Sequence, residues 1–236
     1  MRHSPAVAVV TIDGPSGAGK GTVSRQLAER LGWHLLDSGA LYRLVALAGI
    51  RAGLAADDQA SHVRLASTLE PQFGLRDDGS ERIMLAGEDV TLALRSEETG
   101  AGASRVAAWP PLRAALLKRQ HAFARPPGLV ADGRDMGTVV FPGAALKIFL
   151  SATPEERALR RYNQLKGKDS AVTLAALSRE IAARDRQDAS RPVAPLVPAE
   201  DAVIVDSTLL TAVQVVDALW RLGAQRGLWN SGASRT

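Results

Sequence analysis

Near its N-terminus the chain carries the run Gly14-Pro15-Ser16-Gly17-Ala18-Gly19-Lys20-Gly21-Thr22. The apolar residues 7–12 before it predict a buried strand, and the pattern after it predicts a helix with Val23, Leu27 and Leu31 on one face, ending at Gly32. A glycine-rich loop between a strand and a helix is typical of a phosphate-binding P-loop. Its N–H groups point at phosphate oxygens, the helix N-terminus adds positive potential, and Lys20 supplies a mobile charge. A glycine-rich turn that binds nothing would explain neither Lys20 nor the flanking patterns.

The position after the lysine departs from the usual P-loop. A Ser or Thr commonly follows the lysine, and its hydroxyl binds Mg²⁺. Here Gly21 follows and Thr22 comes next, so we expect Mg²⁺ to be held by Thr22 or through water. The order Gly-Lys-Gly-Thr is similar to that of small-molecule kinases of the nucleoside monophosphate kinase type and unlike that of switch GTPases.

The composition excludes several classes of protein. The 236 residues are 46% apolar and 23% charged, which suffices for one sizeable core, and we expect a single domain and a monomer. The chain has no cysteine, which excludes disulfides and zinc–thiolate sites and fits a reducing cytoplasm. It has no apolar run of about 18 residues that could span a membrane. Asp13 interrupts the first apolar run, which argues against a signal peptide.

The positive charge is concentrated in one window. The whole chain has a formal net charge of +4, whereas residues 157–191 alone contain nine Lys or Arg against four Asp or Glu, a net of +5. A basic chain can bind nucleic acid. A charge this concentrated, on a chain with a P-loop, instead favours nucleotide phosphates. We therefore expect small-molecule substrates and neither a nucleic-acid nor a membrane partner.

The rest of the chain alternates strands with helices. We expect strands at 33–36, 129–131, 145–150 and 202–206, and helices from 40, over 57–66, over 110–123, from 153 to a polar break at 166–170, and over 173–188. A closing helix would carry Leu209, Val213, Val216 and Trp220 on one face. A hairpin and a third short strand at about 71–95 break the alternation, and a short helix and turn follow at 96–106.

These patterns predict an α/β fold: a five-stranded parallel sheet with helices on both faces, as in P-loop NTPases of the nucleoside monophosphate kinase type. We expect a small antiparallel β insertion and a helical lid within this one domain. The expected limits are 6–70, 105–152 and 200–225 for the core, about 71–104 for the insertion, and about 153–192 for the lid. The resemblance of the loop to that of nucleoside monophosphate kinases implies that the insertion binds the monophosphate. Residues 227–236 are expected to be a disordered tail.

Polar residues follow two of the predicted strands at their carboxyl ends, where open parallel sheets bind ligands. Asp37 and Ser38 follow one strand and precede a helix with Tyr42 and Arg43. A plain helix cap is the alternative interpretation of Asp37 and Ser38. Asp132 follows another strand, where P-loop enzymes keep a carboxylate that orients Mg²⁺; its alternative role is a cap or turn residue.

Arginines gather downstream of these strands. Arg184, Asp188 and Arg191 are spaced i, i+4 and i+7, which predicts one helix face; the alternative is an exposed ion-pair ladder of little value. The preceding helix carries three more, which are Arg157, Arg160 and Arg161. Guanidinium groups hold phosphates bidentately and stay charged. Phosphoryl transfer between two mutually repelling polyanions needs such groups, and a lid that carries them also excludes water.

Four motifs together resemble the bacterial cytidylate kinase family, over about residues 7–225. They are the run at 14–22, Asp-Ser-Gly-Ala-Leu-Tyr-Arg at 37–43, Ala-Asp-Gly-Arg-Asp-Met-Gly-Thr at 131–138, and the Arg184, Asp188 and Arg191 set before Val-Ala-Pro-Leu at 193–196. The resemblance implies ATP- and Mg²⁺-dependent phosphorylation of CMP, and of dCMP, to the diphosphate with release of ADP.

The resemblance also implies roles for single residues. ATP phosphates would be held by Gly14, Pro15, Ser16, Gly17, Ala18, Gly19, Lys20, Gly21 and Thr22, and Mg²⁺ by Thr22 and Asp132. The phosphate of the acceptor would be held by Arg43, Arg134 and Arg191, its ribose by Asp188 with Arg184, and its base by Ser104, Arg113 and Asp135, with Ser38 and Tyr42 as further substrate contacts. The catalytic set would be Lys20, Arg134, Arg191, Arg157 and Arg161; which lid arginine reaches the transferred phosphoryl group stays open.

Other functions compete with this one. A monophosphate kinase for another base would share most of these motifs. The spacing Asp-Ser-x-x-x-Tyr-Arg is also similar to that of tRNA prenyltransferases, so a P-loop tRNA-modifying transferase is an alternative, against which the Gly-Lys-Gly-Thr loop and the Arg134-Asp135 pair count. A nucleotide switch is disfavoured because the sequence has no Asn-Lys-x-Asp element that reads a base.

Overall fold

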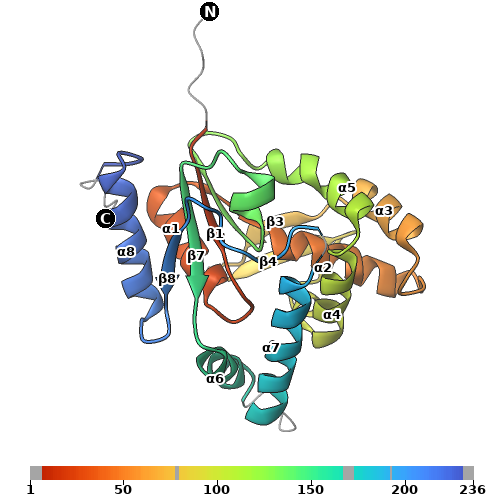
Figure 1. Cartoon of the computed structure of the whole chain (residues 1–236). Coiled ribbons are helices and arrows are strands. Elements are labelled where there is room, and N and C mark those ends of the chain that lie inside the picture. Colours follow the sequence, from red (N-terminus) through yellow and green to blue (C-terminus); the bar gives the residue numbers. More distant parts are fainter. Residues whose placement is uncertain (1–6, 78–79, 167–172, 192, 231–236) are drawn as a thin grey trace, which may run out of the picture. The chain divides into compact units, whose positions relative to one another are not determined.

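The computed structural model describes residues 7–77, 80–166, 173–191 and 193–230 (Figure 1). Its packing separates two compact units. Unit 1 comprises the chain up to Asp37 and from His121 onward, and unit 2 comprises Ser38–Gln120. The chain therefore passes between the units twice, after Asp37 and after Gln120.

Unit 1 contains the predicted five-stranded parallel sheet. Its strands are β1 (Val9–Asp13), β2 (His34–Asp37), β6 (Leu129–Gly133), β7 (Leu146–Ser151) and β8 (Val203–Asp206), in the spatial order β2-β6-β1-β7-β8. The central strand β1 pairs with both β6 and β7, so that Ile12 lies opposite Asp132 on one side and Ile148 on the other. All four pairings are parallel. The carboxyl ends of the strands therefore meet at one edge, which is where an open sheet binds its ligands.

Threonine side chains cap the starts of the last three helices of unit 1. The helices of this unit are α1 (Lys20–Leu31), the π-helical segment η2 (Met136–Val140), α6 (Pro154–Leu165), α7 (Leu174–Ala189) and α8 (Ala212–Gln225). The side chains of Thr153 and Thr173 accept hydrogen bonds from the third residue of α6 and α7, and Thr211 forms a capping box with Gln214 at α8. The segment η2 was not predicted from the sequence.

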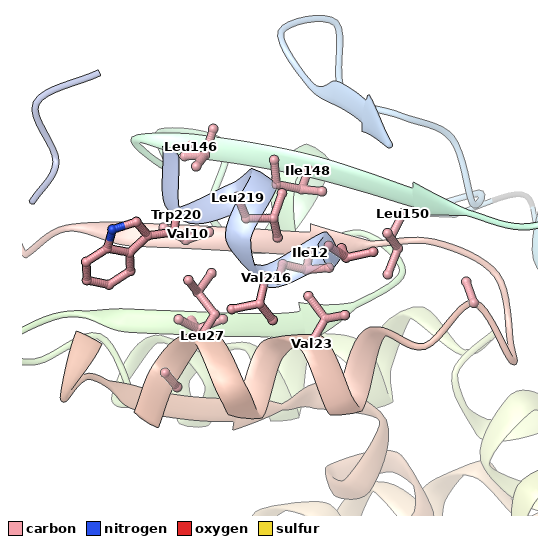
Figure 2. Close-up of a cluster of buried hydrophobic side chains, with 14 residues drawn as sticks. Val10, Ile12, Val23, Leu27, Leu146, Ile148, Leu150, Val216, Leu219 and Trp220 are labelled. Carbon is pink, nitrogen blue, oxygen red and sulfur yellow. The ribbon is translucent and has the colours of Figure 1, made fainter. Parts of the chain in front are cut away.

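The core of unit 1 lies between one face of the sheet and helices α1 and α8 (Figure 2). Ile12 of β1 and Ile148 of β7 face Leu27 of α1 and Leu219 of α8, and all four side chains are almost completely buried. Alternate residues of each strand point to the opposite face, where Thr11 and Lys147 lie close to Gly137 of η2. Burial of this apolar layer fixes α1, and with it the P-loop, against the strand ends.

The apolar face of the last helix differs from the predicted one. Leu209 precedes α8 and is 93% exposed, and Val213 is 62% exposed. The buried side chains are Val215, Val216, Leu219 and Trp220. At 100° per residue, Val213 lies about 90° from the centre of this stripe, at its margin in the first helical turn. The prediction that Val216 and Trp220 lie on the buried face is thus confirmed, whereas the prediction for Leu209 and Val213 was wrong.

Unit 2 combines helices with a small antiparallel sheet, as predicted. Its helices are α2 (Ser38–Arg51), α3 (Gln59–Thr68), the 3₁₀ turn η1 (Ala93–Arg95), α4 (Glu97–Val106) and α5 (Pro110–His121, whose last residue is assigned to unit 1). The strands β3 (Gln72–Leu75), β4 (Glu81–Leu85) and β5 (Glu88–Asp89) pair antiparallel in the order β3-β4-β5. The predicted limits of the insertion, lid and tail stay predictions; residues 78–79, 167–172, 192 and 231–236, on which parts of them fall, lie outside the described residues. None of the helices in the described ranges is both long and apolar enough to cross a membrane.

Candidate active site

The P-loop connects β1 to α1 and has the curled backbone that its glycines predict. Gly14, Gly17 and Gly19 have positive φ angles of 152°, 80° and 91°. Residues that have a Cβ atom adopt such backbone angles only with strain. Lys20 begins α1, is only 5% exposed, and donates a hydrogen bond from Nζ to the Pro15 carbonyl at 2.9 Å. The lysine is therefore held inside the loop that carries it.

Gly14→Ala tests how tightly this loop is seated on the sheet. A Cβ at Gly14 would lie 2.0 Å from the carbonyl oxygen of Leu150 on β7. We expect the free energy of unfolding to fall by about 3 kcal/mol, because rigid backbone must move and the φ angle is strained. Urea denaturation measures this effect. Gly143→Ala is the control, since a Cβ there meets no atom within 4 Å; equal stability of the two variants would contradict the prediction.

Three aspartates at the strand ends surround Lys20. Asp13, Asp37 and Asp132 lie at the carboxyl ends of β1, β2 and β6, and Asp37 is directly opposite Asp132 in the sheet. Burial lowers the pKa of Lys20, and the nearby charge of Arg134 lowers it further, while the three carboxylates act in the opposite direction. Burial also raises the pKa of Asp132, and Asp37 adds to this. The site therefore sets the buried amino group of Lys20 against the buried carboxyl groups of Asp13 and Asp132 and the half-buried Asp37.

Asp13 has a structural role that the sequence analysis missed. Its carboxylate accepts hydrogen bonds from the backbone N–H groups of Met136 at 2.8 Å and Gly137 at 2.7 Å. These residues open η2, directly after Arg134 and Asp135. Asp13 directly precedes the P-loop. Its hydrogen bonds therefore connect the start of the loop to η2, the segment that directly follows two predicted substrate contacts. The signal in the sequence is an acid at the end of an apolar strand, which the sequence analysis treats only as an interruption.

Asp13 should make the stability of the protein depend on pH. Burial raises its pKa from 3.8 to about 6. Between these values the folded protein keeps a proton that the unfolded chain has released, so the stability contributed by protonation is complete below about pH 4 and lost above about pH 6. This pKa change corresponds to about 3 kcal/mol.

Asp13→Asn cannot ionise, so we expect its free energy of unfolding, relative to wild type, to rise by up to about 3 kcal/mol between pH 4 and pH 7. Asparagine accepts only one of the two backbone hydrogen bonds of Asp13, and this loss changes the free energy of unfolding by the same amount at both pH values. Urea denaturation at both pH values checks this, with the exposed Asp57→Asn as the control. A difference from wild type that does not change with pH would contradict the assignment.

Three predicted substrate residues meet at the carboxylate of Asp188. Arg134 donates from Nε to Asp188 Oδ2 at 3.0 Å, and Arg191 donates from Nη2 to Oδ1. Asp188 is 1% exposed, which excludes the alternative of an exposed ion-pair ladder. One correction concerns the helix: α7 ends at Ala189, so Arg191 lies beyond it and turns back to Asp188, while Arg184 lies one turn earlier on α7.

Arg134 belongs to both clusters of charge. Its guanidinium group pairs with Asp188, and it is close enough to Lys20 to lower the pKa of that lysine. The next residue, Asp135, is buried, and its carbonyl accepts hydrogen bonds from the N–H groups of Val139 and Val140 in η2. Arg134, which follows β6, therefore interacts both with the Asp188 cluster and, through its charge, with the P-loop lysine.

The predicted lid arginines differ in their surroundings. Arg157 is buried, and its guanidinium group bonds the Ser16 carbonyl of the P-loop and the carboxylate of Asp185 on α7. Arg160 pairs with Glu156 at 2.8 Å and donates to the carbonyl of Ser207 at 2.6 Å. Arg161 is half-buried on α6. Asp185 and Ser207 are contacts that the sequence analysis did not single out, because nothing local marks them.

Unit 2 places the remaining predicted substrate residues on three helices. Tyr42 on α2 lies beside Arg113 of α5, whose guanidinium carbon is 5.9 Å from the centre of the tyrosine ring. Arg113 also donates to the Ala107 carbonyl at 3.4 Å, close in the chain to the buried Ser104 of α4. The hydroxyl of Ser38 donates to Gln120 at 3.0 Å, and Arg43 is half-buried on α2. Tyr42 and Arg113 are thus brought together within this unit.

The residues predicted to hold Mg²⁺ can be compared with its ordinary ligands. Among the residues that the structure describes, no three His, Cys, Asp or Glu side chains form a metal cage. Mg²⁺ is usually bound by one or two carboxylates, with water and substrate phosphate completing the shell. A Cβ at Gly21 would lie 3.5 Å from Asp132 Oδ2, so the glycine leaves room at that carboxylate. Thr22 is exposed in the first turn of α1. This donor set fits Mg²⁺.

The parallel sheet, the curled loop and the buried lysine at the start of α1 define a P-loop protein. The arginines paired with carboxylates near the loop are typical of a phosphotransferase.

The family model for cytidylate kinase matches residues 10–225. A cytidylate kinase of Marinomonas sp. is 56% identical over 220 residues, which are 93% of this chain and 97% of the relative. A cytidylate kinase of Pseudomonas fluorescens is 58% identical over 212 residues, 89% and 93% of the two chains. Among solved structures, a gluconokinase from Sinorhizobium meliloti covers 94% of this chain and 96% of its own, with 17% identity and a TM-score of 0.47. The chain belongs to the cytidylate kinase family.

Proposed function

We propose that this protein transfers the γ-phosphoryl group of ATP to CMP, and also to dCMP, and releases ADP and the nucleoside diphosphate. The observation that carries this proposal is the place of Arg134, which pairs with Asp188 and whose charge acts on Lys20 of the P-loop. One guanidinium group thus borders both the loop for the donor phosphates and the cluster assigned to the acceptor. Membership in the family and the nearly full-length similarity to cytidylate kinases support it.

The P-loop residues Gly14 to Thr22 would hold the phosphates of ATP through their backbone N–H groups, and Lys20 would neutralise charge on the β- and γ-phosphates. Phosphoryl transfer needs little covalent chemistry from the protein. It needs two polyanions aligned at close range, although like charges about 4 Å apart repel by about 4 kcal/mol at an effective dielectric constant of 20. Arg134 and Arg191 would offset this repulsion at the acceptor phosphate, with Arg43 as a further contact. Arg157 and Arg161 of α6 are the two candidates for contact with the transferred phosphoryl group.

Mg²⁺ would be held by Asp132, directly or through water, with Thr22 as a second ligand. When bound, it supplies positive charge that neutralises the phosphate oxygens. The burial that raises the pKa of Asp132 reflects a poorly solvated carboxylate, and a cation nearby would favour its ionised form. Gly21 keeps the space beside that carboxylate open.

Further residues are assigned to the nucleoside part of the acceptor. Asp188 with Arg184 is assigned to the ribose hydroxyls, and Tyr42 and Ser38 to further contacts. The base is assigned to Ser104, Arg113 and Asp135. Cytosine offers an amino donor beside two acceptors, which suits a hydroxyl or carboxylate together with a guanidinium group. Uracil presents the opposite pattern at two of these atoms, so a buried site of this kind discriminates against UMP.

A coupled assay with ATP and Mg²⁺ across the nucleoside monophosphates tests the proposal. We expect the highest kcat/KM with CMP and dCMP. Greater activity with AMP, UMP or dTMP would establish a monophosphate kinase of another specificity. Salt-sensitive binding of tRNA, together with ATP consumption that CMP does not stimulate, would instead favour a tRNA-modifying transferase. The predicted monomer and cytoplasmic location stay predictions, and light scattering of the purified protein checks the first.

A further inference from the structure

The guanidinium group of Arg157 is occupied on every nitrogen. Its Nε donates to the Ala152 carbonyl at 3.0 Å, and its Nη1 to the Ser16 carbonyl at 3.1 Å. The same Nη1 and Nη2 hold the carboxylate of Asp185 bidentately, at 3.0 and 2.6 Å. The side chain is 4% exposed. A guanidinium group in this state would have to give up four hydrogen bonds to reach a nucleotide.

Each partner of Arg157 belongs to a different part of the site. Ala152 follows the strand β7, Ser16 lies in the P-loop, and Asp185 lies on α7. The inward-pointing N–H groups of a P-loop leave its carbonyls facing outward, where buried oxygens need a donor. Arg157 supplies one to Ser16. Helix α6 also approaches the loop closely, because a Cβ at Gly17 would lie 3.0 Å from the Cβ of Arg157.

Asp185 links Arg157 to α7, the helix whose residues Arg184 and Asp188 are assigned to the acceptor. It lies next to Arg184 and three residues before Asp188, so it shares the last turns of α7 with both. The carboxylate of Asp188 is in turn held by Arg134 and Arg191. A shift of Asp185 would therefore move the backbone that carries these side chains. Displacements of about 1 Å at such groups are enough to cost large factors in rate.

We propose that Arg157 and Asp185 are positioning residues, which fix α7 and its nucleotide-binding side chains against the P-loop. This inference rests on the proposed function. In this arrangement Arg157 does not contact the transferred phosphoryl group, the role that the family resemblance implies for it. The pair instead makes the geometry of the donor loop and of the acceptor cluster interdependent, although neither side chain touches a nucleotide.

A double-mutant cycle with conservative variants tests the proposal: Asp185→Asn, Arg157→Lys and the double variant. We expect Asp185→Asn to raise KM for CMP about tenfold and the dissociation constant for ADP, measured by calorimetry, about threefold, although Asp185 contacts neither nucleotide. Arg157→Lys keeps the charge but lacks the fork, so it should give similar changes. The double variant should be no worse than the more affected single variant, because both remove one connection.

The controls separate positioning from general stability and from the identity of the reaction. Glu180→Gln removes an exposed acid from the same helix and should leave KM, ADP affinity and Tm unchanged. Variants that lose only Tm would overturn the proposal, as would additive effects. Wild-type KM and ADP affinity in Asp185→Asn, with a kcat loss of about 100-fold in Arg157→Lys, would show that Arg157 contacts the phosphoryl group. A wild-type protein inactive on CMP would defeat the proposed function, and ADP calorimetry would still decide the role of the pair.

Discussion

Replacing Lys20 by alanine is expected to lower kcat for CMP phosphorylation by about 10³-fold or more, because cationic groups at the transferred phosphoryl contribute factors of this size. The lysine is buried inside the loop and surrounded by the carboxylates of Asp13, Asp37 and Asp132. Their charges oppose the burial that lowers the pKa of this lysine to about 7. A fixed charge in a poorly solvated site acts strongly on charge that develops during transfer.

The loss should appear in kcat more than in KM for CMP, since Lys20 is assigned to the donor phosphates. Steady-state kinetics at saturating ATP measure it, and circular dichroism establishes that the variant is folded. The exposed Lys118→Ala is the matched control and should behave like wild type. A Lys20→Ala enzyme within tenfold of the wild-type kcat would refute the role of the lysine.

The second large effect is expected at the arginines that hold Asp188. Arg134→Ala and Arg191→Ala should each lower turnover by about 10²-fold or more, because each removes a charge that offsets repulsion between donor and acceptor. Each also leaves the buried Asp188 with one arginine partner instead of two, which displaces a residue assigned to the ribose. Unlike Lys20→Ala, these variants should therefore raise KM for CMP as well.

Initial rates over a range of CMP concentrations distinguish these two contributions. Arg186→Ala is the matched control, since this arginine is exposed on α7 two residues before Asp188 and has no assigned role. Arg134→Lys adds a second comparison. Lysine keeps the positive charge, but it has no Nε–H group to donate the hydrogen bond that Asp188 accepts from Arg134. Near-wild-type turnover in both alanine variants would leave the acceptor site without its proposed basis.

The sequence predicted the elements whose signals are local. The five strands are short apolar runs, the helix starts at Thr153 and Thr173 are marked by capping residues, and the P-loop combines glycines with Lys20. The antiparallel sheet of unit 2 followed from its alternation and its turns. Parallel strands end at a common edge, so Asp132 and Arg134 could also be assigned to the side of the sheet that carries the P-loop.

Contacts between distant segments were not predictable in this way. The residues of η2 give no helical signal; Asp13, more than 120 positions earlier, holds its first two N–H groups. The buried face of α8 depended on where the sheet surface lies, so Leu209 and Val213 were misplaced. Arg157 has the composition of a lid residue, yet its partners Ser16 and Asp185 come from other segments.

The sequence by itself determined the order of strands and helices, the phosphate-binding loop and the set of charged residues near it, because periodicity, capping and glycine content act over a few neighbouring residues. Only the tertiary structure decided which of those charges are paired and buried. That outcome depends on which distant groups the packed strands and helices bring within hydrogen-bonding distance, as at Asp188 between Arg134 and Arg191.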